Sequence, residues 1–274
     1  MEQYRNRRRQ AMFTGNMVTE AIPTRVYSLY RIATSKKDVT RTEAQTMMEP
    51  PEIYGGSSSY FSKVLKAATE LKLLDVQDNV LIPLVPKEQL KDITDFRKYT
   101  NSKLNLFVDE QFFKATNVIV NMNEEIYKYA VSDAYMLKLL TDRLGTQISN
   151  QMALGWRFWA QFLGFGYMNN TSFLPNAYVF VKDVLELLNL EKNKDYQIDE
   201  FMHLFEQYGE ILSGNLQPER NMNIALSSAL RQLHDNKEIE LKYRSDAESR
   251  WILYPSMEQF NDQIASIVYK GVKK

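Results

Sequence analysis

The chain has 274 residues, of which 44% are hydrophobic and 12% aromatic, so it can bury a core in about two or three small domains. Lysine plus arginine equals aspartate plus glutamate at 34 each, which argues against a protein that coats nucleic acid by charge alone. The absence of cysteine excludes disulfides, thiolate metal sites and cysteine nucleophiles.

Residues 1–20 are polar and contain four arginines: Arg5, Arg7, Arg8 and Arg9. We interpret this segment as a flexible basic arm, and the alternative is a tail that grips DNA phosphates. No apolar run of a signal peptide follows the arginines, and no window approaches the ~18–20 apolar residues of a membrane helix. We therefore expect a cytoplasmic protein without a membrane segment.

Residues 21–86 predict a winged-helix domain, in which three helices precede a β-hairpin. Pro23 suits the first turn of the first helix, and Thr40 is expected to cap a second helix that Pro50 and Pro51 end. The third helix, at 58–74, has an apolar stripe of helical period. Two short apolar runs around Gln-Asp-Asn follow it and indicate a hairpin.

The third helix of this domain occupies the position that reads DNA in winged helices. Serines and free backbone N–H groups at its start could hold a phosphate, and the polar side chains opposite the apolar stripe could reach a groove. The candidate contacts are Ser57, Ser59, Tyr60, Lys63 and Lys66. The alternative is a solvated face, with Glu70 among its polar residues, on a domain that binds only proteins.

Residues 87–175 predict a central helical region with a long helix at 126–144, which Gly145 ends. The densest aromatic run of the chain, at 153–166, includes Trp156, Trp159 and Phe165. Aromatic side chains at helical spacing favour a packed core over a stack of bases. Gly164 and Gly166 indicate a turn with close backbone packing, because no phosphate-loop motif surrounds them.

Residues 176–256 predict a second winged-helix-like domain, with helices at 177–190, 198–213 and 222–236. Residues 238–244 alternate polar and apolar and are expected to form a hairpin with 250–254. Residues 257–274 are expected to form a C-terminal helix. The candidate DNA contacts here are Arg231, Lys242 and Arg244, and a protein-binding role is the alternative.

Catalytic patterns are weak throughout the sequence. Glu240 and Lys242 match half of a metal-dependent nuclease core, but the Asp that such a core needs on a preceding strand is missing from the pattern. His203 and His234 lack a second ligand at metal-binding spacing. We expect a non-enzymatic protein without metal or cofactor, and keep an unrecognised nuclease as the alternative.

Three motifs resemble those of a known protein family. They are Pro-Pro-Glu-Ile-Tyr-Gly-Gly at 50–56, Phe-Trp-Ala-Gln-Phe-Leu-Gly-Phe-Gly at 158–166 and Leu-Pro-Asn at 174–176. The chain resembles the DpdG proteins of bacterial systems that insert 7-deazaguanine bases into DNA and restrict unmodified DNA. The resemblance implies an accessory component of a modification–restriction or phage-defence system, and it implies no catalytic residues.

Together these patterns predict a mainly α protein with two winged-helix-like domains that flank a helical middle region. The leading hypothesis is a non-catalytic accessory protein that contacts duplex DNA with modest affinity and docks other proteins of the same system. The alternative is a protein–protein scaffold that uses its winged helices for docking without DNA contact.

Overall fold

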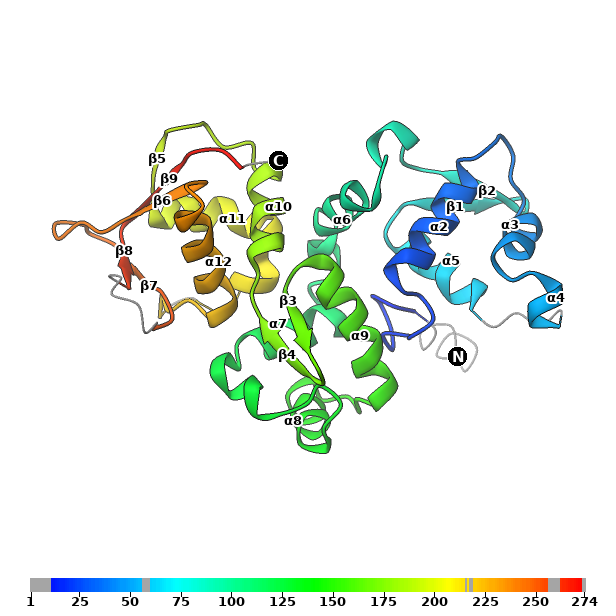
Figure 1. Cartoon of the computed structure of the whole chain (residues 1–274), viewed down its shortest axis with the longest axis horizontal. Coiled ribbons are helices and arrows are strands. Elements are labelled where there is room, and N and C mark those ends of the chain that lie inside the picture. The colour runs from blue at the N-terminus through cyan, green and yellow to red at the C-terminus, as the bar shows by residue number, and fades with distance from the viewer. Residues whose placement is uncertain (1–10, 56–59, 215, 217–218, 256–261, 273–274) are drawn as a thin grey trace.

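The computed structural model describes residues 11–55, 60–214, 216, 219–255 and 262–272. The protein is mainly α-helical with small antiparallel sheets, and its elements fall into three successive groups (Figure 1). We call residues 23–83 the first unit, 111–175 the central unit and 178–269 the last unit. In Figure 1 the first and last units lie at opposite ends, and the central unit lies between and below them.

The first unit has the three predicted helices and the hairpin in the predicted order, together with a short helix, α4, that the sequence did not predict. Its elements are α2 (Pro23–Ala33), α3 (Arg41–Met48), α4 (Pro51–Tyr54), α5 (Phe61–Glu70), β1 (Leu74–Gln77) and β2 (Val80–Pro83). The Thr40 hydroxyl caps α3 by accepting the Glu43 N–H at 3.1 Å. Asp78 and Asn79 turn the β1–β2 hairpin at positive φ, and Thr40 bridges to Val80 beside it.

The central unit is less helical than the sequence predicts. Its elements are α7 (Gln111–Val120), the 3-10 helix η3 (Asn123–Lys128), α8 (Ala134–Leu144), α9 (Asn150–Leu163), β3 (Gly166–Asn169) and β4 (Ser172–Pro175). The single helix expected at 126–144 is wrong. Val131 lies in a turn between η3 and α8 and donates its N–H to the Thr171 carbonyl at 3.1 Å, and Asp133 caps a new helix by accepting the Tyr135 N–H at 2.8 Å.

The last unit differs from the sequence prediction in two ways. Its elements are α10 (Tyr178–Leu187), β5 (Asp195–Gln197), α11 (Ile198–Ser213), α12 (Ile224–Asp235), β6 (Ile239–Lys242), β7 (Trp251–Ile252), β8 (Gln263–Ile264) and β9 (Ser266–Tyr269). The helix expected at 257–274 is wrong where the structure describes that segment, because β9 is the middle strand of a β5-β9-β6 sheet. The expected pairing of 238–244 with 250–254 is also wrong, since β7 pairs with β8.

One order of elements occurs three times along the chain. A helix is followed by a short bridging segment, two further helices, with the short α4 between them in the first unit, and then antiparallel strands, which in the last unit are β6 and β9. The first helices are α2, α7 and α10, and the third helices, each directly before its strands, are α5, α9 and α12. The bridging segment hydrogen-bonds to the strand region in each unit, as in Leu81 N–H to Val39 O at 2.9 Å. The central region, expected to be helical, therefore also contains the antiparallel pair β3–β4.

Residues 11–20 are part of the packed structure, which corrects the flexible arm expected at 1–20. Ala11, Met12, Phe13 and Met17 are buried. The Phe13 ring packs on Phe107 and Trp159, with centroids 5.1 and 4.8 Å apart. Only residues 1–10 of the expected arm lie outside the described residues.

The carboxylate of Glu70, at the end of α5, fixes this segment. It accepts the backbone N–H groups of Met12, Phe13 and Thr14 at 2.9–3.2 Å, as well as the Thr14 hydroxyl. Glu70 was expected on the polar outer face, but it is buried. The energy of these charge-assisted hydrogen bonds offsets the cost of removing a carboxylate from water.

A glycine on α9 allows residues 11–20 to approach that helix closely. A Cβ atom on Gly155 would lie 1.7 Å from the Met17 carbonyl oxygen. One turn later, the Trp159 indole N–H donates to the Ala21 carbonyl at 2.7 Å. The third helix of the central unit is therefore covered by the chain that leads into the first unit.

The connection from the first to the central unit contains η1 (Lys87–Gln89), α6 (Ile93–Asn101) and η2 (Leu104–Phe107). Arg97 on α6 forms a two-pronged ion pair with Asp183 on α10, at 2.8 and 3.0 Å. The Asn101 amide donates to the same carboxylate at 2.9 Å. Burial raises the pKa of Asp183, and the Arg97 charge opposes that rise.

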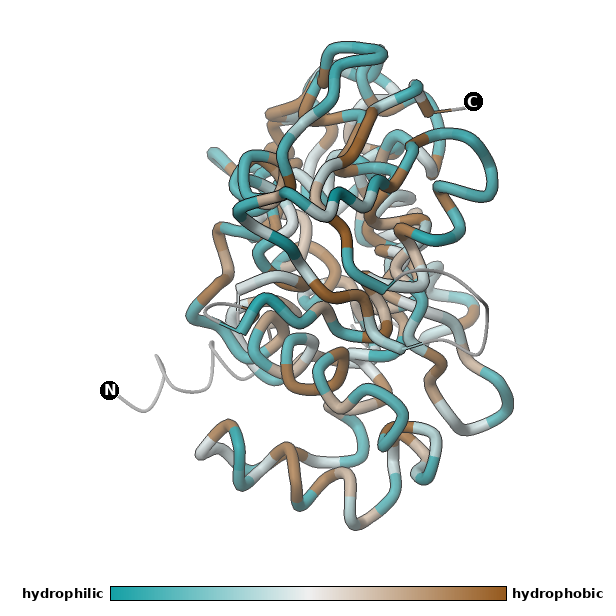
Figure 2. The backbone as a smooth tube through the Cα atoms, turned by 90° about the vertical axis from the view of Figure 1, so that its left-hand side faces the viewer, coloured by the Kyte–Doolittle hydropathy of each residue, from teal (hydrophilic) through white to brown (hydrophobic). Residues whose placement is uncertain are grey.

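Buried residues of all three units form one hydrophobic cluster, which includes Phe61, Trp156 and Phe201. Hydrophobic and hydrophilic residues are interspersed along the chain, as expected for elements that bury one side (Figure 2). In the part of the chain that the structure describes, no helix is long and apolar enough to cross a membrane.

Replacing Asp183 with Ala is expected to lower the free energy of unfolding by about 3 kcal/mol, because Arg97 loses the buried partner of its ion pair. The control is Lys98→Met, which breaks the half-exposed pair with Glu186 and should cost about 0–1 kcal/mol. Urea denaturation measures both values. Equal losses in the two variants would contradict the role of the Arg97–Asp183 pair.

Replacing Gly155 with Ala is expected to cost about 1–3 kcal/mol of stability, because the methyl group collides with the backbone at Met17. The matched control is Gln151→Ala on the exposed side of the same helix, which should stay within about 0.5 kcal/mol. Thermal melting measures stability, and limited proteolysis should show faster cleavage within 11–21 only for Gly155→Ala. Unchanged cleavage and stability would show that the close approach is not required.

Candidate nucleic-acid interface

The outer face of α5 carries fewer free polar groups than the sequence suggests. Ser62 and Lys66 are exposed, one turn apart. Lys63 lies beside them but forms an ion pair with Glu20, which leaves its side chain 22% exposed. Burial alone would raise the pKa of Glu20, but the hydrogen bond and charge of Lys63 outweigh it and lower that pKa. Among the described residues, Lys66 is the cationic side chain on this face that has no such partner.

The start of α5 is already occupied by a carboxylate of the protein. Glu49 accepts the N–H groups of Tyr60 and Phe61 at 2.6 and 3.0 Å. A carboxylate at this place satisfies the same donors, and the same helix dipole, that a phosphate would. The expected phosphate site therefore lacks these two N–H groups, and its Ser57 and Ser59 lie outside the described residues.

Tyr60 is buried, which contradicts its expected reach into a DNA groove. Its side chain is 8% exposed, and its hydroxyl donates to the Met48 carbonyl. The Arg25 guanidinium stacks over its ring at 4.1 Å from the centroid. Tyr60 therefore packs α5 against the end of α3. The four expected contacts at Arg5, Arg7, Arg8 and Arg9 lie outside the described residues.

The candidate cations of the last unit are held by acidic partners. Arg231 on α12 pairs with Asp262 at 2.6 Å and is only 12% exposed. Lys242 and Arg244 both pair with Asp195, at 3.3 and 2.5 Å. Burial alone would raise the pKa of Asp195. The Ser266 hydroxyl and the charges of Lys242 and Arg244 outweigh burial, so the pKa of Asp195 is lowered. These cations would have to leave Asp195 or Asp262 to contact a phosphate.

The aromatic run on α9 belongs to the core, as the sequence favours. Trp156, Trp159 and Phe165 are buried, and the Trp156 indole N–H donates to the Thr116 hydroxyl at 2.9 Å. Phe158 and Phe162 are half-buried. Gly166 lies so close to β4 that a Cβ atom would be 2.3 Å from the Leu174 carbonyl oxygen. The turn expected at 164–166 is confirmed, and Gly164 ends α9 at a φ of 87°.

Glu240 and Lys242 lie on the face of the sheet that also carries Asp195. Asp195 and Glu240 both stand opposite Val268, one on each side of β9. Glu240 pairs with Lys270 at 2.9 Å. Among the described residues, no three His, Asp or Glu side chains are arranged to hold a metal ion. The observed contacts of the Glu-x-Lys pair are thus ion pairs across a strand.

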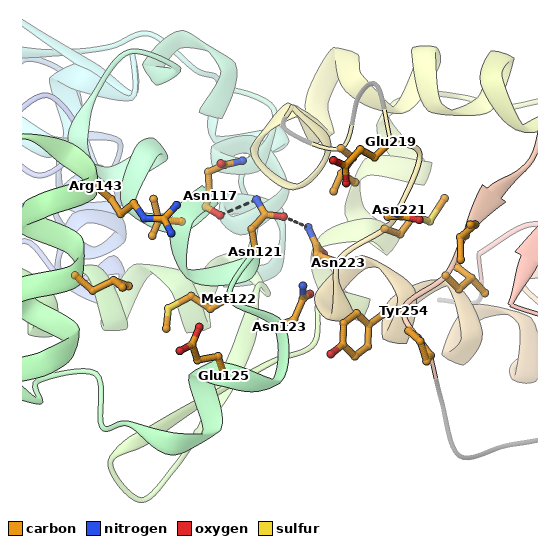
Figure 3. A pocket seen from close by; sticks show the side chains of 17 residues that line it. Asn117, Asn121, Met122, Asn123, Glu125, Arg143, Glu219, Asn221, Asn223 and Tyr254 are labelled. Atoms are coloured by element: carbon orange, nitrogen blue, oxygen red, sulfur yellow. Dashed lines mark hydrogen bonds between the residues drawn. The ribbon is translucent and has the colours of Figure 1, made fainter.

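The sequence reasoning missed a polar pocket of about 750 Å³ between the central and last units (Figure 3). Five asparagines line it, and the signal in the sequence is their clustering in two short segments: Asn117, Asn121, Asn123, Asn221 and Asn223. Asn223 donates to the Asn121 amide oxygen at 3.1 Å, and the Ile224 N–H donates to the Asn123 amide oxygen at 2.8 Å. These bonds join η3 to the start of α12.

The effect of Asp195 on stability is expected to depend on pH. Because its pKa is lowered in the folded state, it stabilises the fold above the ordinary carboxyl pKa of about 3.9, and that contribution is lost as the pH falls. Urea denaturation between about pH 5 and pH 3 should therefore show a smaller loss for Asp195→Asn than for the unmodified protein. Parallel pH profiles would contradict this expectation.

Comparisons with known proteins agree with the motif resemblance. A family model described as DpdG-like matches residues 16–247, which is most of the chain. No curated protein and no solved structure gives a significant match. The chain therefore belongs to the DpdG-like family of the 7-deazaguanine modification system.

Proposed function

We propose that the chain is a non-catalytic, cytoplasmic accessory protein of this system, which contacts duplex DNA through its first unit and docks other proteins through the central and last units. The observation that carries the proposal is the solvent-facing side of α5. Of the three third helices, α5 has two lysines, Lys63 and Lys66, on its outer face. The exposed residues of α9 are Asn150, Gln151 and Gln161, and those of α12 are Gln232 and Asp235, while α9 and α12 each carry one half-buried arginine, Arg157 and Arg231.

The order of elements supports a winged-helix architecture for each unit. A winged helix contains a helix, a short strand, two helices and a two-stranded wing, and its third helix enters the major groove. The bridge between Thr40 and Val80 supplies the short strand in the first unit. The β5-β9-β6 sheet supplies the corresponding strands in the last unit. In this architecture α5 and the β1–β2 hairpin would face DNA together.

The charges around α5 support modest and sequence-tolerant affinity. Asp75 and Asp78 on the wing are exposed and would repel phosphates. Lys63 must leave Glu20, or share it, to reach the backbone. Lys66, Ser62 and the arginines of the N-terminus remain as phosphate contacts. Bidentate hydrogen bonds to bases need Asn, Gln or Arg side chains, and the described part of α5 contains none of these residues.

Titration of duplex DNA at about 50 mM and about 200 mM salt tests the proposal. Binding should weaken about tenfold or more at the higher salt, because counterions compete for the phosphates. Lys66→Met should weaken binding about fivefold at low salt and reduce the salt dependence by about one phosphate contact. The control is Lys192→Met, an exposed lysine of the last unit. No binding at low salt, or equal effects of the two variants, would reject DNA contact through α5.

A protein–protein scaffold is the second candidate, because apolar side chains are exposed beside the strands of all three units. Tyr167 on β3 is 55% exposed, Leu84 after β2 is 49% exposed and Tyr243 after β6 is 48% exposed. Exposed tyrosines are typical of protein interfaces. Co-purification with other proteins of the system, without DNA binding at low salt, would favour this candidate.

A further inference from the structure

The pocket between the central and last units contains charged side chains without protein partners. Arg143 on α8, Glu125 on η3 and Glu219 before α12 all line it. Within the described part of the chain, none of the three side chains forms a hydrogen bond or an ion pair. Figure 3 shows Arg143 and Glu219 on opposite sides of the asparagine network. A guanidinium and two carboxylates are therefore held apart around one space.

The asparagine network makes the wall of this pocket rigid. Asn223 is bound at both ends of its amide, because its nitrogen donates to Asn121 and to the Leu212 carbonyl while its oxygen accepts the Leu226 N–H. Asn123 is bound through its oxygen only. Its amide nitrogen therefore has a fixed direction and two N–H donors with no partner among the described residues. Preorganised donors of this kind favour ligand binding, since little entropy is lost.

Apolar surfaces complete the lining. Tyr254 follows β7, and its backbone N–H donates to the Ser227 hydroxyl at 2.7 Å, which fixes the residue at the pocket wall. Met122 and Leu139 lie in the same lining. Figure 3 places the Tyr254 ring beside Asn123. A planar ligand could rest on these side chains while its edge contacts the polar groups.

We propose that this pocket binds a guanine-type base, as a free nucleoside or as a nucleotide turned out of the DNA stack. The edge of guanine has the acceptor O6 next to the donors N1–H and N2–H, so one ligand edge can satisfy both a guanidinium or amide donor and a carboxylate that line the same space. Adenine lacks the adjacent pair of donors. One free guanidinium against two free carboxylates disfavours a phosphate-rich ligand. Guanine and 7-deazaguanine share this edge and differ at position 7.

Binding of guanosine, 7-deazaguanosine and adenosine to the full chain, measured by isothermal titration calorimetry, tests the proposal. Guanosine, 7-deazaguanosine or both should bind at least about tenfold more tightly than adenosine, because each lost charged hydrogen bond costs about that much. A preference between the first two shows whether the source is an ordinary or a 7-deaza base. Equal binding of all three, no binding at millimolar concentration, or tighter binding of inorganic phosphate would overturn it.

Variants link the binding to the pocket. Arg143→Met and the double variant Glu125→Gln/Glu219→Gln should each weaken guanosine binding about tenfold or more, and the double variant should lose the preference over adenosine. Lys138→Met removes an exposed cation from the same helix outside the pocket lining and should have no effect. Unchanged affinity in the pocket variants would overturn the assignment. The pocket shares no residue with α5, so duplex binding and base binding can succeed or fail separately.

Discussion

The arrangement of the first two units depends on a single carboxylate, that of Glu70. By binding three consecutive backbone N–H groups of residues 12–14, it converts a polar stretch of chain into one that can be buried. Phe13 can then reach Phe107, Phe112 and Trp159, and the following residues can cross α9 at Gly155. Without an acceptor at that point, three N–H groups would be buried without partners, at a cost of about 1–3 kcal/mol each.

Acidic side chains of the protein itself occupy three of the places where an external anion could bind. Glu49 occupies the start of α5, Glu20 neutralises Lys63, and Asp195 neutralises two cations of the last unit. Each pair lowers the local potential that would attract a polyanion. The protein therefore differs from strongly basic DNA-binding domains, whose cations are free.

Local signals in the sequence predicted the elements that depend on local physics. Thr40 caps α3, and Asp78 and Asn79 accept the positive φ that a tight hairpin needs. The errors lie where long-range contacts decide. The Ser266–Tyr269 segment was expected to be helical, although its Ile, Val and Tyr side chains favour a strand, and it becomes the middle strand because β5 and β6 each offer it an edge.

Long-range contacts also limit how well the candidate sites could be predicted from the sequence. Lys66 is exposed as predicted, because its helix has one clear apolar stripe. Tyr60 and Glu70 were expected on that polar face, but their partners, Met48 and residues 12–14, lie far away in the sequence and could not be inferred. The asparagine pocket was missed for the same reason, since Asn121 and Asn223 meet only in the folded chain.

Residues 17–21 cross α9, and this crossing decides which surface of the central unit is accessible. A helix that sits directly before the strands is the natural surface for a foreign molecule, yet in the central unit the chain's own backbone lies on it. In the central unit this helix therefore contacts the chain's own backbone instead of solvent along that side. Because residues 17–21 lead directly into α2, the same crossing joins the first unit to the central unit.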